Sequence, residues 1–168
     1  MATVLAWVLV VLAAVAVLGI VVWSVRTANR LDRLHVRYDL SWQALDAALA
    51  RRAVVARAIA ADAYGEGPAA RRLTAMADAA ERAPRPEREG CENELSTELT
   101  LVDPAAVPPG LVAELTEAES RVLLARRFHN DAVRDTLALR ERRPVRWLRL
   151  GGRAALPTYF EIAESAQR

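Results

Sequence analysis

The chain contains 168 residues, of which 53% are hydrophobic and 26% are charged, a balance that excludes both a disordered tail and a protein embedded entirely in a membrane. Its 23 basic and 21 acidic side chains leave a formal net charge of +2, which does not describe a uniformly basic, nucleic-acid-coating surface. One cysteine excludes an intramolecular disulfide and a multi-cysteine metal site, and two histidines leave little for a histidine-based one.

The first predicted element is an apolar helix over residues 3–25, which carry no ionisable side chain. At 1.5 Å per residue, a helix of this length spans roughly 34 Å, enough to cross a hydrocarbon core of about 30 Å. Trp7 and Trp23 lie toward its two ends, as interfacial aromatic residues do in membrane helices. A cleaved signal peptide is the alternative, but it needs a basic segment before the apolar run, which the chain lacks. We predict a transmembrane anchor over residues 1–25.

The charges that flank the apolar run indicate its orientation. No basic side chain precedes it, whereas Arg26 and Arg30 follow it directly and Arg33 and Arg37 come within two further turns. Positively charged residues beside a membrane helix favour the cytoplasmic side. We therefore expect a single-pass protein of the cell membrane, with its N-terminus outside and the remainder of the chain in the cytoplasm.

Helical periodicity continues beyond the anchor. Apolar residues recur every three or four positions from Leu31 to Ala60, and no glycine or proline interrupts residues 22–64. One helix is therefore expected to run from the membrane to the turn at residues 65–68. Because prolines and glycines divide the rest of the chain, three more helices are expected, over residues 69–83, 87–102 and 110–142.

The predicted fold class is all-α: a transmembrane helix continues into an antiparallel four-helix bundle, in the order long, short, short, long, over residues 26–143. The two short helices leave the half of the bundle nearest the membrane uncovered. The tail over residues 144–168 is therefore expected to pack back onto the bundle. This packing would bury Trp147, Tyr159 and Phe160.

The antiparallel arrangement also predicts ion pairs. Residues of the two long helices should face each other where their numbers add up to about 170. This register would pair Asp46 with Arg126 or Arg127. It would also pair Arg51 with Glu119.

Several stretches of the sequence resemble motifs of the LemA family. Residues 42–52 read WQALDAALARR, which is similar to that family's W-S-x-I-D-V-Q-L-K-R-R. Residues 114–133 resemble its E-L-x-x-T-E-N-x-I-A-x-A-R-x-x-Y-N-x-x-V helix, and Pro144, Gly151 and residues 159–161 sit where its F-P, F-G and final F-E motifs fall. The resemblance is that of a divergent member and implies a membrane-anchored antiparallel bundle. It implies no mechanism, because the family has no established common activity. The motif residues to which it assigns a structural role are Trp42, Asp46, Arg51, Arg52, Glu119, Arg126 and Asn130.

The sequence contains no pattern that predicts catalysis. His35 and His129 lie at helical spacing with no cysteine, serine or acid placed beside them as a triad partner. The LemA pattern has tyrosine at position 129, so His129 is expected to pack as an aromatic residue. The glutamates of residues 87–98 lack the spacing of an EF-hand, and a solvated acidic helix is expected there. Cys91 has polar neighbours and is expected to be exposed. We expect no enzyme, with no catalytic residue, cofactor or metal site.

An arginine-rich segment over residues 140–153 leaves three alternatives open. It could track a nucleic-acid backbone, contact anionic lipid, or only complement the dipole of the preceding helix. On a membrane-tethered chain, lipid contact is the simpler interpretation, and nucleic acid is disfavoured. The residues concerned are Arg140, Arg142, Arg143, Arg146, Trp147, Arg149 and Arg153.

The function that these features favour is a non-enzymatic scaffold or interaction module at the cell membrane. Its partners would be the lipid bilayer and a protein that the sequence does not identify, and the oligomeric state stays open. The alternative function is an anionic-lipid- or nucleic-acid-binding protein that acts through residues 140–153.

Overall fold

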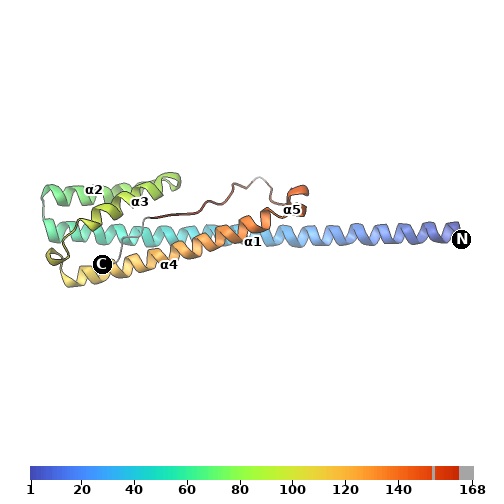
Figure 1. Ribbon diagram of the computed structural model, residues 1–168, viewed down its shortest axis with the longest axis horizontal. Helices are drawn as coiled ribbons and strands as arrows, with labels where there is room; N and C mark the ends of the chain where they lie inside the picture. Colours follow the sequence, from blue (N-terminus) through green and yellow to red (C-terminus); the bar gives the residue numbers. More distant parts are fainter. Residues whose placement is uncertain (153, 163–168) are drawn as a thin grey trace. The chain divides into compact units, whose positions relative to one another are not determined.

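The computed structural model describes residues 1–152 and 154–162. These residues are 83% helical and contain no β-strand, so the all-α prediction is confirmed for this part of the chain. The elements are α1 (Ala2–Tyr64), α2 (Pro68–Arg82), α3 (Arg85–Thr100), the 3-10 helix η1 (Pro104–Ala106), α4 (Pro109–Arg140) and α5 (Arg143–Trp147) (Figure 1). The first four α-helices end within two residues of their predicted ends. The short α5 lies in the tail, for which the sequence predicts no helix.

Proline and glycine set the helix boundaries. α1 stops at Tyr64, after which Gly65 adopts a left-handed backbone conformation with φ 56°, which glycine takes without a steric penalty. Every later α-helix has a proline at its first or second position. There the missing N–H would have had no partner within the helix. The residues that separate the helices in the sequence therefore also separate them in the structure.

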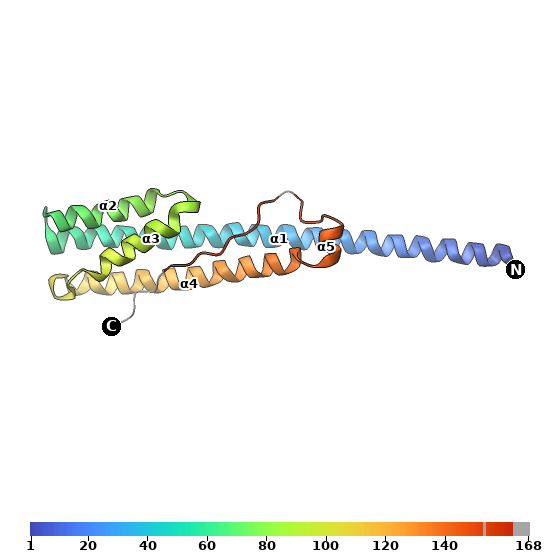
Figure 2. The ribbon, with the colours of Figure 1, turned by 45° about the horizontal axis from the view of Figure 1, so that its top comes forward.

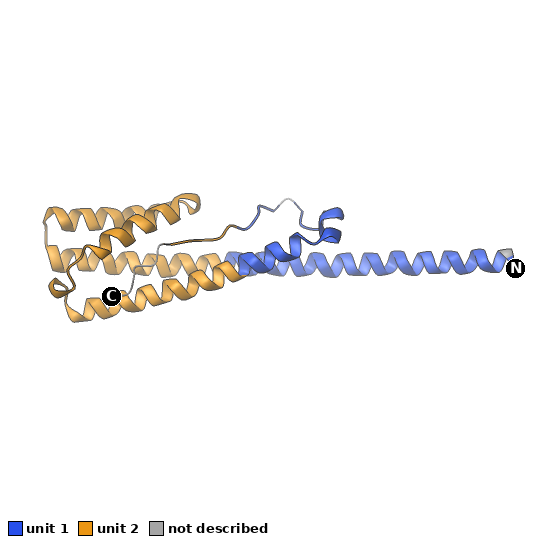
Figure 3. Ribbon diagram, viewed as in Figure 1, with its two compact units in different colours: residues 1–39, 132–157 blue, residues 40–131, 158–168 orange. Residues whose placement is uncertain are grey.

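The described chain forms two compact units (Figure 3). Unit 1 contains residues 1–39 and 132–157, and unit 2 contains residues 40–131 and 158–168, of which the last six lie outside the described residues. Because α1 and α4 each contribute to both units, each unit combines segments that are far apart in the sequence.

Unit 2 is held together by a core of mostly small apolar side chains. Ala56 and Ala60 of α1, Leu73 of α2, Leu95 of α3 and Ala118 of α4 are buried in one cluster. The alternation of small and large side chains lets neighbouring helices interdigitate. Removal of this apolar surface from water stabilises the unit.

A second cluster in unit 2 joins α1 and α4 to the end of the chain. Leu45 and Leu49 of α1, Val122 of α4 and Phe160 of the tail are buried in it, and Trp42 packs against them. Phe160 is 3% exposed, so the expectation that this residue of the tail packs on the core is confirmed.

The expected burial of the other two aromatic residues of the tail is wrong. Tyr159 is 48% exposed and Trp147 is 82% exposed. Tyr159 and Phe160 are adjacent in a non-helical stretch, where successive side chains point to opposite sides, so only one of them faces the core. Trp147 ends α5, and the side chain that α5 buries is Val145.

Unit 1 contains the apolar part of α1. Among the described residues, α1 alone is long and apolar enough to cross a membrane, and its most apolar window has no buried residue. A signal sequence passes the same test, as does the core helix of a soluble protein, although that helix would be mostly buried. Burial along α1 begins at Ser24 and Thr27 and continues to Leu31, which packs with Leu139 and Val145. α5 accordingly lies beside α1 in both views (Figures 1 and 2).

Candidate functional site

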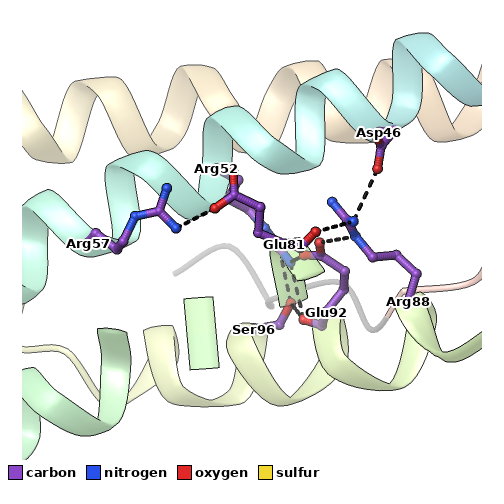
Figure 4. A network of polar contacts seen from close by, with 7 residues as sticks. All are labelled: Asp46, Arg52, Arg57, Glu81, Arg88, Glu92 and Ser96. Atoms are coloured by element: carbon purple, nitrogen blue, oxygen red, sulfur yellow. Dashed lines mark hydrogen bonds and ion pairs between the residues drawn. The ribbon is translucent and has the colours of Figure 1, made fainter. Parts of the chain in front are cut away.

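A buried network of charged side chains joins α1 to α3 in unit 2 (Figure 4). The carboxylate of Glu92 lies between two guanidinium groups, those of Arg52 at 2.6 Å and Arg88 at 3.0 Å. The Glu92 side chain is 0% exposed, and those of Arg52 and Arg88 are each 5% exposed. Arg88 also pairs with Asp46 at 3.1 Å, and Arg52 donates to the hydroxyl of Ser96 at 3.0 Å. Two arginines and two acids leave the network electrically neutral.

Local spacing and backbone bonds explain how these charges are accommodated. Arg88 and Glu92 are one helical turn apart on α3, so their side chains meet on one face. Arg52 also donates to the backbone carbonyl of Glu92 at 3.1 Å, and Arg88 donates to that of Glu81 at 3.0 Å. Charges buried to this degree persist only when paired and hydrogen-bonded. The network therefore fixes α3 on α1 and presents no unpaired charge to a ligand.

Two sequence expectations are wrong at this network. Residues 87–98 were expected to form a solvated acidic helix, but Glu92 is the member of that series that faces α1 and is buried. Asp46 was expected to pair with Arg126 or Arg127, but its partner is an arginine of α3. The expected register considered only α1 and α4. Asp46 instead faces α3, which supplies Arg88 as its partner.

The predicted register of α1 against α4 holds in one place and is offset in another. Ser41 and His129, whose numbers add up to 170, are in contact at 3.1 Å. Arg51 pairs with Glu114 at 2.9 Å, and not with Glu119. Glu119 is half-buried and makes no ion pair with any residue that the structure describes. The observed and expected partners of Arg51 are five residues apart, roughly 7.5 Å along a helix. The long arginine side chain reaches over this distance, which a register based on backbone positions does not take into account.

Trp42 is the centre of an aromatic cluster in unit 2. Its ring centroid lies 5.6 Å from that of His129 and 5.8 Å from that of Phe160, both in edge-to-face geometry. The guanidinium of Arg85 lies 4.1 Å from the same ring centroid, a cation–π contact. The amide nitrogen of Asn130 donates to the carbonyl of Phe160 at 3.0 Å, and its oxygen accepts from the Phe160 N–H at 2.9 Å. These two bonds hold the tail beside the cluster.

Arg126 also binds the tail. Its guanidinium donates to the carbonyl of Ile162 at 3.3 Å and lies 3.7 Å from the carboxylate of Glu161. The N–H of Glu161 in turn donates to a carboxylate oxygen of Glu89 at 3.2 Å. Arg126 therefore binds the tail, and Asp46 pairs with Arg88 instead.

His129 is buried in the same cluster. Its Nε2 donates to the carbonyl of Thr158 at 3.3 Å, and its Nδ1 lies 3.1 Å from the hydroxyl oxygen of Ser41. Because a carbonyl oxygen only accepts, the bond to Thr158 requires a proton on Nε2, and in the neutral ring Nδ1 is then the acceptor for the Ser41 hydroxyl. Burial lowers the pKa of His129 from its usual 6.5, against the opposing effect of the Thr158 carbonyl, and the charge of Arg85 lowers the pKa further. The prediction that His129 packs as an aromatic residue is confirmed by its contact with Trp42.

We predict that this histidine makes the stability of the fold depend on pH. The pKa of His129 is lower in the folded chain than in the unfolded chain, where it is about 6.5, so the unfolded chain binds more protons between the two values. The free energy of unfolding should fall as the pH drops below about 6.5, by at most about 1.4 kcal/mol per pH unit. Denaturant titrations of the full chain in detergent micelles measure this slope. The slope should be smaller in His129→Gln, and an equal slope in the two proteins contradicts the prediction.

A shallow apolar groove lies between α1 and α4 on unit 2. Ala44, Ala47 and Ala48 line it on α1, and Leu124 and Phe128 line it on α4. The side chains of Leu124 and Phe128 are 54% and 56% exposed. Grouped exposed apolar residues are typical of interaction surfaces. Leu124 could not be selected from the sequence, because exposure is not visible in a helical repeat.

Residues 140–152 of the arginine-rich segment lie in unit 1. Its last residue, Arg153, is outside the described residues. Arg140 donates to the carbonyls of Ala154 and Ala155 at 2.9 and 3.2 Å, so it holds the following chain. Four other arginines of this segment are exposed and make no ion pair with a described residue. They are Arg142, Arg143, Arg146 and Arg149. The predicted interface residues of α1 are also exposed, and these are Trp7, Trp23, Arg26 and Arg30.

The lone thiol does not form part of a site. The expectation that Cys91 is exposed is wrong. Its side chain is half-buried, because it lies on a face of α3 that packs against the core of unit 2. Within residues 1–152 and 154–162, no group of three or more histidine, cysteine, aspartate or glutamate side chains has the arrangement of a metal site.

A scan against protein-family models, a search of curated proteins and a search of solved structures each find no match for the chain.

Proposed function

We propose that the protein is a membrane-anchored, non-enzymatic interaction module of LemA-like type, in which the apolar part of α1 crosses the cell membrane and continues into an antiparallel four-helix bundle. The observation that carries this proposal is the pattern of exposure along α1. The large apolar side chains from Val4 to Val25 are 41–71% exposed, and burial begins at Ser24. Such a surface is unfavourable in water and favourable in lipid. The apolar stretch thus ends where packing against other residues starts.

The charges of unit 1 favour one orientation. Arg26 and Arg30 follow the apolar stretch and are exposed, and arginines at this position are typical of the cytoplasmic side. We place the bundle in the cytoplasm and the N-terminal end of α1 outside. The partners are the lipid bilayer and a protein, for which the exposed groove that contains Leu124 and Phe128 is a suitable surface.

The roles of the ionisable residues support a structural function. Glu92 lies between two arginines, and His129 is held between Ser41 and Thr158. These groups have the burial that could tune a catalytic residue, yet their bonds are made to the protein's own helices and tail. The LemA-like motif residues Trp42 and Asn130 also make contacts of this kind.

Alkaline extraction of membranes from cells that express the full chain tests the anchor. We expect the chain to stay in the membrane pellet, because only hydrophobic insertion resists this wash. A matched variant that lacks residues 3–25 should be released.

Thiol labelling tests the orientation. In a Cys91→Ala background, a membrane-impermeant maleimide should label Ala75→Cys only after lysis, since this position on α2 is exposed. Labelling in intact cells would reverse the orientation.

A genetically encoded photo-crosslinking residue tests the interaction module in the same membranes. Placed at Phe128, it should give a discrete adduct with another protein, because that side chain is exposed in the groove. Placed at Ala75, on a different helix, it should not. Release of the full chain by the wash, or the same adducts from both positions, would contradict the proposed function.

A further inference from the structure

α5 packs against α1 close to the end of the apolar stretch. Val145 of α5 is buried against Leu31 of α1, which lies six residues, roughly 9 Å, beyond Val25. The covered face of α1 extends back through Thr27 to Ser24. A headgroup layer extends roughly 5–8 Å beyond the hydrocarbon core on each side. If the apolar stretch spans a bilayer, α5 therefore lies at the outer edge of that layer.

The end of α5 has a well-defined structure. The N–H of Leu150 donates to the carbonyl of Val145 at 3.0 Å, and the N–H of Arg149 donates to that of Arg146 at 3.2 Å. This pair of bonds, together with the packing of Leu150 in the cluster of Val145, is the Schellman ending of a helix. The residue at its left-handed position is Arg149, with φ 51°. Glycine would take this conformation with less strain.

The side chains that α5 and its flanks expose combine apolar surface with positive charge. Trp147 and Leu148 are 82% and 47% exposed. Tryptophan with this exposure is unusual in water and common at a membrane interface. Around them stand four exposed arginines that make no ion pair with a described residue, Arg142, Arg143, Arg146 and Arg149. The strained position of one arginine is consistent with a need for its side chain.

We infer that α5 and its flanking arginines form a platform that binds the headgroups of anionic phospholipids, with Trp147 and Leu148 inserted at the membrane interface. The inference rests on the proposed anchoring by α1, which keeps α5 near the bilayer. Arginine pairs with phosphate through a planar fork of donors, and arginines beside an anionic leaflet are attracted to it over about one Debye length. Lipid is favoured over nucleic acid because of the exposed apolar side chains between the charges.

The test uses the full chain reconstituted into vesicles, in a Cys91→Ala background, with an environment-sensitive fluorophore on Leu148→Cys. One set of vesicles contains phosphatidylcholine alone, and the other contains phosphatidylcholine and phosphatidylglycerol. We expect a blue shift and an emission increase only with phosphatidylglycerol, and we expect both to decline at high salt. Both leaflets have the same composition, so the orientation of insertion does not matter. The same label on Val36→Cys, an exposed position of α1 in unit 1, should not respond.

Charge-matched variants separate the platform from general attraction. Arg146→Gln with Arg149→Gln should reduce the response to phosphatidylglycerol at least about threefold. Arg71→Gln with Arg127→Gln removes the same charge from exposed positions of unit 2 and should leave the response unchanged. Equal responses in the two vesicle types, equal losses in the two variants, or a larger response to a free oligonucleotide would overturn the inference. Failure of the chain to float with neutral vesicles would instead overturn the proposed anchor.

Discussion

Replacement of Glu92 with glutamine is expected to lower the free energy of unfolding by about 3–5 kcal/mol. The carboxylate is fully buried between Arg52 and Arg88, whose side chains are 5% exposed. Its removal leaves two buried guanidinium groups with one partly exposed acid, Asp46, to compensate them. The loss thus includes both broken bonds and the cost of unpaired charge in a low dielectric. Denaturant unfolding of the full chain in detergent micelles, followed by far-ultraviolet circular dichroism, measures the effect.

Two comparisons make this result specific. Glu114→Gln also removes a glutamate from an ion pair with an α1 arginine, but Glu114 and Arg51 are 49% and 54% exposed, so the expected loss is only about 0–1 kcal/mol. In a triple variant, Arg52→Met, Arg88→Met and Glu92→Leu remove the buried charges together. That variant should recover most of the stability, because the attraction within a buried network is largely offset by desolvation. Equal losses for Glu92→Gln and Glu114→Gln would show that the network is hydrated.

The helices could be predicted from the sequence because their signals are local. The absence of proline and glycine from Val21 to Tyr64 lets α1 continue beyond its apolar part, and prolines mark the starts of the later helices. α5 has five residues, too few for a helical repeat to be visible, and its position depends on the packing of Val145 on Leu31. Local patterns therefore fix the long elements, and tertiary contacts fix the short one.

The contacts of the site were harder to predict than its residues. Trp42, Arg52 and Asn130 were selected by motif and occupy structural positions. Glu92 was missed because a row of glutamates in one helix reads as a solvated face. The available signal was Arg88, one turn before it, which is the sole basic residue in residues 87–119. The second partner of Glu92 is Arg52, which lies 40 positions away. Only the packing of α3 on α1 brings these two residues together.

The contribution of the tail is expected to reside in Phe160 and in the side chain that holds it. Phe160→Ala should lower the free energy of unfolding by about 3–5 kcal/mol, because the ring is 3% exposed and packs edge-to-face on Trp42. Asn130→Ala leaves both the N–H and the carbonyl of Phe160 without their bonds at 2.9 and 3.0 Å, and should lower it by about 1–3 kcal/mol.

Tyr159→Ala is the matched control for these two variants, because it removes an aromatic ring from the adjacent position. That ring is 48% exposed, so its loss should change the free energy of unfolding by no more than about 0.5 kcal/mol. Phe160→Ala combined with Asn130→Ala should cost less than the sum of the two, since each change undoes the same docking of the tail. Limited proteolysis should cut the tail faster in both single variants than in Tyr159→Ala. Additive losses, or a loss in Tyr159→Ala as large as that in Phe160→Ala, would mean that the tail is not held beside Trp42.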